Sequence, residues 1–169
     1  DNGTIHLTGT AVIADGILAN AGTLEADGSG NKLDHETITN TGTIEVLDGG
    51  FLTIDLASSI ENASGDVTVD AGGTLTLDHA TINHGTVTDN GTIHLTGTAV
   101  IADGIRANLG TLHADGSRNQ PDTETLTNTA TLQELDGGFL TILLANSGGN
   151  ATRTLPADAT RPLTLVLSH

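Results

Sequence analysis

The stretch Asp-Asn-Gly-Thr-Ile-His-Leu-Thr-Gly-Thr at residues 1–10 recurs unchanged at residues 89–98. The similarity continues without a gap, because residues 1–60 match residues 89–148 at an offset of 88, with about 45 of 60 positions identical. Such identity indicates a recent duplication, which is typical of repeat arrays rather than of enzymes. The first residue also falls on the same repeat phase as the start of the second copy, so we expect the chain to begin inside an array.

A shorter period lies inside the long repeat. It is marked by the phrase Asn-x-Gly-Thr followed by Ile, Leu or Val, loosely read, whose glycine stands at positions 3, 22, 42, 65 and 91. The spacings of 19, 20, 23 and 26 residues add up to the offset of 88, which indicates coils of about 19–26 residues. We therefore interpret residues 1–88 as a first long repeat of about four coils, and residues 89–149 as a second, partial and diverged repeat of about three coils. Residues 150–169 would form an irregular tail or a capping strand.

Apolar and polar residues alternate inside each coil. In Thr4–Thr8, Ile5 and Leu7 share one face, while the Thr and His side chains share the other. This period of two is expected of a half-buried strand, and we find no convincing helical pattern. In the second copy Glu134 replaces Val46, which predicts a carboxylate on the core face of that coil. The candidate core positions are Ile5, Leu7, Ile44, Val46, Leu52, Ile54, Val67, Val69, Leu75, Leu77, Ile93, Leu95, Leu140 and Ile142.

Two β architectures are compatible with this alternation. An antiparallel sandwich would pair neighbouring strands through hairpins, and Asp15-Gly16 is a suitable hairpin turn. Against the sandwich, similar strands recur in every coil, and winding the chain places their identical side chains one above another. We therefore predict an all-β fold, a parallel β-helix or β-solenoid with two to three short strands per coil. Right-handed winding is the expectation for parallel crossovers, and we expect one continuous solenoid.

The composition excludes several functional classes. The chain has 169 residues, a formal net charge of −16 and no Cys, which leaves no disulfide, thiolate metal site or cysteine nucleophile. Its five basic residues are scattered, whereas a nucleic-acid surface needs clustered Lys and Arg, so we expect no nucleic-acid partner. No apolar run approaches the roughly 20 residues that span a bilayer, so we expect no membrane insertion.

One acidic loop is a candidate calcium site. Asp27, Ser29, Asn31 and Asp34 offer oxygen atoms at near-alternate positions, the spacing by which a tight loop wraps a hard cation. The equivalent loop of the second copy contains Arg118, whose positive charge should weaken cation binding there. The alternative, which we prefer, is a turn held by local side-chain to backbone hydrogen bonds. We expect no other cofactor.

Three further arrangements suggest other activities. The equivalent residues His6 and His94 face outward, but no His-x-His or His-x-x-x-His pair points to a transition metal. Thr-x-Thr rows are similar to the ranks of ice-binding solenoids, although coils of unequal length and charged residues interrupt them. Paired carboxylates such as Glu45 and Asp48 would suit a glycan-active β-helix enzyme, but 21 acidic residues make chance pairs unavoidable. We expect no catalysis.

The repeated phrases resemble those of a known class of protein. Thr-Asn-Thr-Gly-Thr-Ile-Glu-Val at residues 39–46, Gly-Gly-Thr-Leu-Thr-Leu-Asp at residues 72–78 and Thr-Asp-Asn-Gly-Thr-Ile-His-Leu at residues 88–95 resemble the repeats of large bacterial surface proteins, the filamentous haemagglutinin-like and autotransporter-like adhesins. The resemblance covers about residues 1–148. It implies an extracellular β-helical segment at the bacterial cell surface, with a part in adhesion, biofilm or surface-layer construction.

We therefore expect a non-catalytic structural segment, a stalk or a fibre-forming module, of an extracellular adhesin-like repeat protein. Its expected partners are adjoining repeats of the same protein or end-to-end stacked copies, while other regions would contact a host or surface glycan or protein. The alternatives are a calcium- or ice-binding β-solenoid module and, less favoured, a glycan-active β-helix enzyme.

Overall fold

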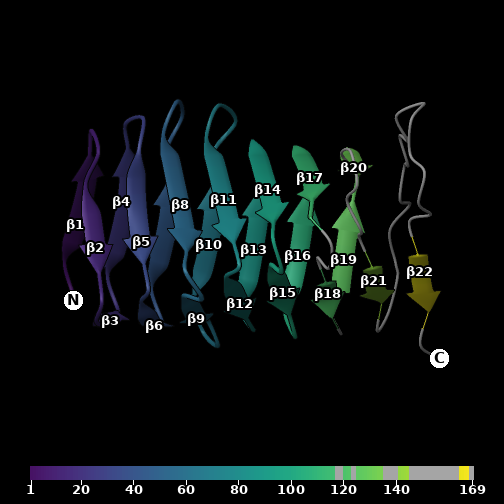
Figure 1. The fold of residues 1–169 in the computed structure, drawn as a ribbon, viewed down its shortest axis with the longest axis horizontal. Coiled ribbons are helices and arrows are strands. Elements are labelled where there is room, and N and C mark those ends of the chain that lie inside the picture. The colour runs from purple at the N-terminus through teal and green to yellow at the C-terminus, as the bar shows by residue number, and fades with distance from the viewer. Residues whose placement is uncertain (117–119, 123–124, 135–140, 145–163, 168–169) are drawn as a thin grey trace.

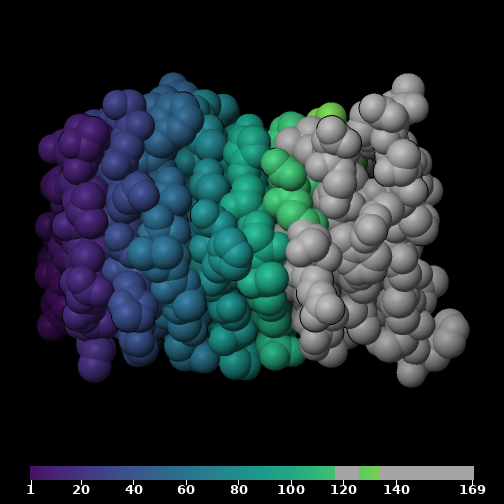
Figure 2. Space-filling model, in the orientation of Figure 1, coloured from purple at the N-terminus to yellow at the C-terminus, as the bar shows by residue number. Residues whose placement is uncertain are grey.

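The computed structural model of the chain describes residues 1–116, 120–122, 125–134, 141–144 and 164–167, with side chains described for residues 1–116 and 126–133. Within these ranges the fold is all-β, and the strands wind into a solenoid whose coils follow one another along the long axis (Figures 1 and 2). The predicted β-solenoid is thereby confirmed. The described residues include no helix long and apolar enough to cross a membrane.

Each complete coil contributes one strand to each of three parallel sheets, which we name A, B and C. Sheet A contains β1 (Thr4–Thr8), β4 (Thr23–Asp27), β7 (Thr43–Val46), β10 (Asp66–Val69), β13 (Thr86–Asp89), β16 (Ile105–Asn108) and β19 (Thr125–Asn128). Sheet B contains β2 (Val12–Ala14), β5 (Asn31–Asp34), β8 (Phe51–Asp55), β11 (Thr74–Asp78), β14 (Thr92–Thr96), β17 (Thr111–Asp115) and β20 (Thr131–Glu134). Sheet C contains β3 (Ile17–Asn20), β6 (Thr37–Asn40), β9 (Ser59–Glu61), β12 (Thr81–Asn83), β15 (Val100–Ala102) and β18 (Gln120–Asp122). A fourth, two-stranded sheet pairs β21 (Thr141–Leu144) with β22 (Thr164–Leu167), so the tail supplies a strand.

The core is a set of aliphatic rows that run along the solenoid axis. Ile44 lies between Leu24 and Val67 on the neighbouring coils, and none of these three side chains is exposed. The alternation predicted from the sequence is confirmed, since the candidate core positions from Leu7 to Leu95 are at most 4% exposed. Ile5, in the first coil, is only partly buried. Leu140 and the side chains of Ile142 and Glu134 lie outside the described residues, although the Cα of Glu134 pairs with that of Ala114.

The coils are slightly shorter than the glycine spacings suggest. The register along sheet A advances by 19 to 23 residues per coil, as in the pairs Thr4 with Thr23 and Thr43 with Asp66. The largest glycine spacing, the 26 residues between Gly65 and Gly91, spans a coil of 20 residues from β10 to β13 and one strand more. The long repeat of 88 residues is therefore four coils and one further strand.

This extra strand rotates the second copy by one face of the solenoid. β1 lies in sheet A, whereas β14, which has the same sequence, lies in sheet B. In the same way β2 lies in sheet B and its identical copy β15 in sheet C. The same sequence therefore forms a strand in two different sheets. This is possible because every sheet requires only that alternate side chains be aliphatic on the core face and polar on the outer face.

Glycine at the corners makes this exchange of faces sterically feasible. Gly22 turns the chain from sheet C into sheet A, and its equivalent Gly110 turns it from sheet A into sheet B. A Cβ atom would lie 1.9 Å from the Gly3 carbonyl oxygen at Gly22, and 2.2 Å from the Gly91 carbonyl oxygen at Gly110. Both corners therefore bring successive coils too close together for any side chain.

The rotated register predicts which engineered cysteines form a disulfide. Thr76 in β11 pairs with His94 in β14, so the Cα atoms of a Thr76→Cys/His94→Cys variant lie within the roughly 4.4–6.8 Å that a disulfide spans. We expect this variant to lose both free thiols under mild oxidation. The chain has no cysteine of its own, which makes thiol titration unambiguous.

The matched control is Thr68→Cys/His94→Cys. These two positions are 26 residues apart, like Gly65 and Gly91, and would face each other if that glycine spacing were one long coil. Thr68 lies in sheet A and pairs with Thr88, so these two cysteines should stay reduced. Oxidation of the control in preference to the first variant would refute the rotation.

Candidate functional site

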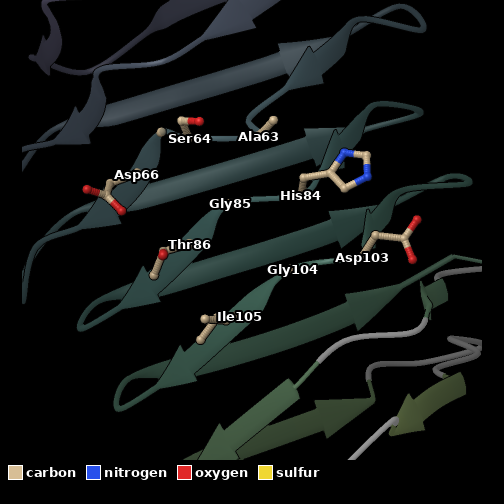
Figure 3. A pocket seen from close by; sticks show the side chains of 10 residues that line it. Ala63, Ser64, Asp66, His84, Gly85, Thr86, Asp103, Gly104 and Ile105 are labelled. Carbon is tan, nitrogen blue, oxygen red and sulfur yellow. The ribbon is translucent and has the colours of Figure 1, made fainter.

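The candidate site is a groove of about 570 Å³ along the corner between sheets C and A. Three successive corners line it. Residues 63–65, 84–85 and 103–104 connect sheet C to sheet A, and each is followed by the first residue of a sheet A strand, Asp66 of β10, Thr86 of β13 or Ile105 of β16. Figure 3 shows Asp66, Thr86 and Ile105 along one side of the groove, one per coil, and His84 and Asp103 along the other. Equivalent positions of three coils therefore build one continuous depression.

The groove owes its depth to glycine. A Cβ on Gly85 would lie 2.0 Å from the backbone oxygen of Asn62, and one on Gly104 would lie 2.7 Å from that of Gly85. Gly85 also has a positive φ of 65°, a backbone conformation that side chains disfavour. Because neither glycine position has room for a side chain, the corner is hollow there, and the residues on either side of each glycine form the walls of the groove.

The lining combines two carboxylates and one imidazole with hydroxyl and aliphatic groups, from Ala63, Ser64, Asp66, His84, Thr86, Asp103 and Ile105. Asp66 and Asp103 are exposed, and His84 Nδ1 lies 2.7 Å from Glu61 Oε1 on the preceding coil. This lining suits water or a cationic group. In the part of the chain that the structure describes, no three His, Asp or Glu side chains converge in a way that could hold a metal ion.

The four residues of the predicted calcium loop lie on two consecutive strands and the connection between them. Asp27 is exposed at the end of β4 in sheet A, Ser29 is exposed in the connection, and Asp34 lies in sheet B at the end of β5. Asn31 is completely buried, where its Oδ1 accepts the Ala11 N–H at 3.1 Å and its Nδ2 donates to the Asp27 carbonyl at 3.3 Å. The Asn31 amide is therefore occupied by the backbone, as in the turn that the sequence analysis prefers. Calcium binding by this loop stays a hypothesis.

A buried polar ladder is a feature that the sequence analysis missed. Asn20 Nδ2 donates to Asn40 Oδ1 at 2.8 Å, and Asn40 Nδ2 donates to Asn62 Oδ1 at 2.7 Å, so one amide is bonded to the next along the axis. The second copy repeats the arrangement on sheet A, where Asn108 donates to Asn128. The signal in the sequence is the Asn that ends the segments Ile17–Asn20, Thr37–Asn40 and Thr125–Asn128, two positions after an inward residue.

The rotation of the second copy brings this ladder against an aliphatic row. Along sheet A the inward row runs Val46, Val69, Asp89 and Asn108, so Asp89 stands where valine gives way to asparagine. Asp89 Oδ1 accepts the Gly91 N–H at 3.0 Å, while Asp89 Oδ2 and Asn108 Oδ1 are buried without a hydrogen-bond partner among the described residues. Two oxygen atoms that can only accept hydrogen bonds therefore belong to residues that are paired on neighbouring strands.

Burial raises the pKa of Asp89 to about 6, against the opposing effects of the nearby Arg106 charge and of the Gly91 hydrogen bond. Arg106 is itself 1% exposed and continues the aliphatic row of Val87, at the position that Leu18 occupies in the first copy. The sequence analysis did not single out Arg106, although the Leu-to-Arg replacement is visible in the alignment of the two copies.

We predict that Asp89→Asn stabilises the protein at neutral pH. The folded state holds the Asp89 proton more tightly than the unfolded chain does, so this carboxyl lowers stability as pH rises from about 4 to about 6. An asparagine is neutral, and its Nδ2 can donate to Asn108 Oδ1 as Asn20 donates to Asn40. We expect the free energy of unfolding at pH 7.5 to rise by roughly 1–3 kcal/mol in urea titrations.

The difference between variant and parent should shrink as pH falls from about 6 to below the unfolded-state pKa of 3.8, where Asp89 becomes protonated in both states. Asp103→Asn, at an exposed residue, is the matched control and should change stability by about 0.5 kcal/mol or less. A gain for Asp89→Asn that does not depend on pH would contradict the proposed cause.

Two repeat-equivalent sites on the surface carry opposite electrostatics. In the first copy His6 Nδ1 lies 2.7 Å from Glu25 Oε2 on the next coil. At the equivalent positions of the second copy, the rings of His94 and His113 stack with centroids 4.8 Å apart and an interplanar angle of 8°. The imidazole thus faces a carboxylate in the first copy and a second imidazole in the second copy.

The pKa values of both stacked histidines are lowered. Burial is the main cause for each, opposed at His94 by Asp115 and reinforced at His113 by the charge of His94. A histidine whose pKa is lower in the folded state gives up stability as pH falls below about 6.5. Acid should therefore loosen this part of sheet B.

We predict that His94→Gln raises the pKa of His113 toward 6.5, because it removes the neighbouring positive charge. Proton NMR titration of the His113 ring measures this midpoint. His6→Gln, in the first coil, is the control and should leave the His113 midpoint unchanged. If both variants behave alike, the two rings are not in contact.

No family model, no curated protein and no solved structure matches this chain. Its function is therefore inferred from its own residues.

Proposed function

We propose that this chain is a non-catalytic structural segment, a stalk or fibre-forming module, of an extracellular bacterial adhesin-like repeat protein. The observation that carries the proposal is the unbroken stacking of coils, in which the strands of each coil pair with those of the next in sheets A, B and C as far as β19, β20 and β18. A rod of this kind holds whatever lies at its two ends at a fixed separation. With about 4.8 Å per coil, the six coils that complete all three sheets extend roughly 30 Å.

Side chains add links between the coils. Lys32 Nζ donates to Asp55 Oδ2 at 3.0 Å, and this hydrogen bond raises the pKa of Lys32. His35 Nδ1 lies 3.0 Å from Asp15 Oδ1, again between successive coils. The exposed ion pairs each contribute little, whereas the buried Asn20 and Asn40 amides join the coils where water cannot compete.

The surface charge supports a role in which rods stay apart laterally. The chain carries a formal net charge of −16, and one of its five basic side chains, Arg106, is buried in the core. Burial together with the nearby Asp70 and Glu25 raises the pKa of Glu45, a sign of how crowded the acidic groups are along sheet A. Strong like charge favours solubility and disfavours side-to-side association.

The ice-binding alternative has one supporting observation. Thr74, Thr92, Thr111 and Thr131 occupy successive positions of one outward row in sheet B. Two residues further along each of these strands stand Thr76, His94, His113 and Gln133. Of these four coils, only the one with Thr74 and Thr76 therefore has a Thr-x-Thr pair. We therefore keep the structural role as the proposal.

Single-molecule stretching from the two ends tests the mechanical role. We expect a folded rod that resists extension and then unfolds in discrete steps. Asn40→Ala breaks the buried ladder on both sides, and it should lower the unfolding force and reduce stability by about 1–3 kcal/mol. The matched control is Thr39→Ala, whose side chain is exposed on the adjacent position of the same strand.

Extension of the parent chain without a force barrier would refute the mechanical role. The extracellular location has a separate test: antibodies raised against the purified chain should label intact bacteria of the source strain. Labelling only after the cells are opened would overturn that part of the proposal.

A further inference from the structure

The histidines whose side chains the structure describes fall into two groups. Four of them each place Nδ1 at 2.7–3.0 Å from a carboxylate oxygen. These pairs are His6 with Glu25, His35 with Asp15, His79 with Asp78 and His84 with Glu61. His94 and His113 instead lie against each other, with ring centroids 4.8 Å apart and an interplanar angle of 8°. A second imidazole therefore stands where the other four histidines have a carboxylate.

The register of sheet B brings the two rings together. His94 of β14 pairs with His113 of β17, and both occupy outward positions of their strands. Neighbouring strands lie about 4.8 Å apart, so side chains at paired positions project side by side. The two histidines are 19 positions apart in the chain, which is why no His-x-His or His-x-x-x-His spacing reveals the pair.

The two copies of the repeat differ by one residue at this place. His94 is the equivalent of His6, and His113 is the equivalent of Glu25. The first copy therefore has an imidazole beside a carboxylate, whereas the second has two imidazoles on consecutive coils. The fold accepts either residue at the second position, because that position faces outward in both copies.

Both rings are available as metal ligands. Burial lowers the pKa of each, so both are neutral at pH 7, the form in which imidazole binds a metal ion. His113 Nδ1 has no hydrogen-bond partner among the described residues, so no hydrogen bond to this atom fixes the orientation of the ring. Two nitrogens bound to one metal ion at about 2.1 Å each lie roughly 3 Å apart, so the stacked rings must tilt toward each other to share an ion.

The surroundings of the pair suit a partly hydrated cation. Along the row the neighbours are Thr76 and Gln133, which carry no charge. Asp115, two positions after His113 on the same face, supplies a negative charge that also acts on His94. No third His, Asp or Glu converges on the two rings in the part of the chain whose side chains are described, so water would complete the coordination.

We propose that His94 and His113 together bind one divalent transition-metal ion of the class of Ni²⁺, Cu²⁺ and Zn²⁺ on the outer face of sheet B. Imidazole is a favoured ligand of these ions, whereas Mg²⁺ and Ca²⁺ prefer oxygen. The bound ion links β14 to β17 and therefore one coil to the next. It stabilises the folded chain, because the unfolded chain does not hold the two rings together. This site goes beyond the proposed structural function and does not depend on it.

Titration of the full chain with Ni²⁺ at pH 7.5, followed by proton NMR of the histidine rings, tests the site. We expect substoichiometric Ni²⁺ to broaden the ring signals of His94 and His113 before those of the four histidines that face carboxylates. Calorimetry should give one tightly bound Ni²⁺ per chain. The melting temperature should rise more with Ni²⁺ than with the same concentration of Mg²⁺.

Two variants remove and transplant the pair. His113→Gln replaces one ring by the side chain that its neighbour Gln133 already has in the same row, and it should weaken Ni²⁺ binding by roughly tenfold or more. Glu25→His places a second imidazole beside His6 and should add a second Ni²⁺ site. His79→Gln removes an imidazole that faces a carboxylate, so this control should leave the Ni²⁺ affinity unchanged.

Three outcomes would overturn the metal site. Broadening of all histidine signals at the same Ni²⁺ concentration would assign the binding to the acidic surface as a whole. Equal Ni²⁺ affinity of His113→Gln and the parent chain would show that His113 is not a ligand. A Glu25→His chain that still binds a single ion would show that two neighbouring imidazoles do not suffice. None of these results bears on the rod, whose mechanical role is tested by stretching.

Discussion

The structure depends on one constraint: no coil can bury its own aliphatic side chains. Each strand contributes only one or two inward residues, as Ile44 and Val46 do in β7, and these are covered by the coils on either side. Stability is therefore a sum over neighbouring pairs of coils, as in other solenoids. The first coil shows the effect of losing one neighbour, because Ile5 is partly exposed while Ile44 is not exposed at all.

The same constraint explains both the success of the duplication and its cost. The aliphatic rows accept any strand with the right alternation, so a copy displaced by one face still builds a continuous core. A polar row is less tolerant, because amide must stack on amide. Where the displaced Asn108 row meets the Val69 row, Asp89 is buried with its pKa near 6. The perturbed carboxyl is thus a product of where the two copies join, and it requires no catalytic explanation.

Much of the fold could be predicted from the sequence, because alternation and period are local signals. The pattern Thr4-Ile5-His6-Leu7-Thr8 identifies an inward and an outward face without any partner strand. The rotation of the second copy was not predictable from glycine spacing alone, since a spacing of 26 residues fits a long coil as well as a coil and an extra strand. Pairing decides between them, and pairing is a long-range property.

The polar sites were harder to predict for the same reason. Asn31 stands among residues typical of a cation-binding loop, but its amide bonds the Ala11 N–H of the neighbouring coil and the Asp27 carbonyl of its own coil. The groove beside His84 arises only when three glycine corners stack, although the glycines themselves are evident in the sequence. Residues one coil apart are about 20 positions apart in the chain, so local motifs cannot show which of them meet.

The displacement by one face also bears on how such a gene would change with time. Recombination between the two copies removes or adds a whole unit of 88 residues, and the strands on either side of the event still find partners of the same kind. The protein would then become shorter or longer while its aliphatic rows stay continuous. Everything beyond the crossover turns by about a third of a revolution about the axis, so a change in copy number also changes the direction in which the far end points.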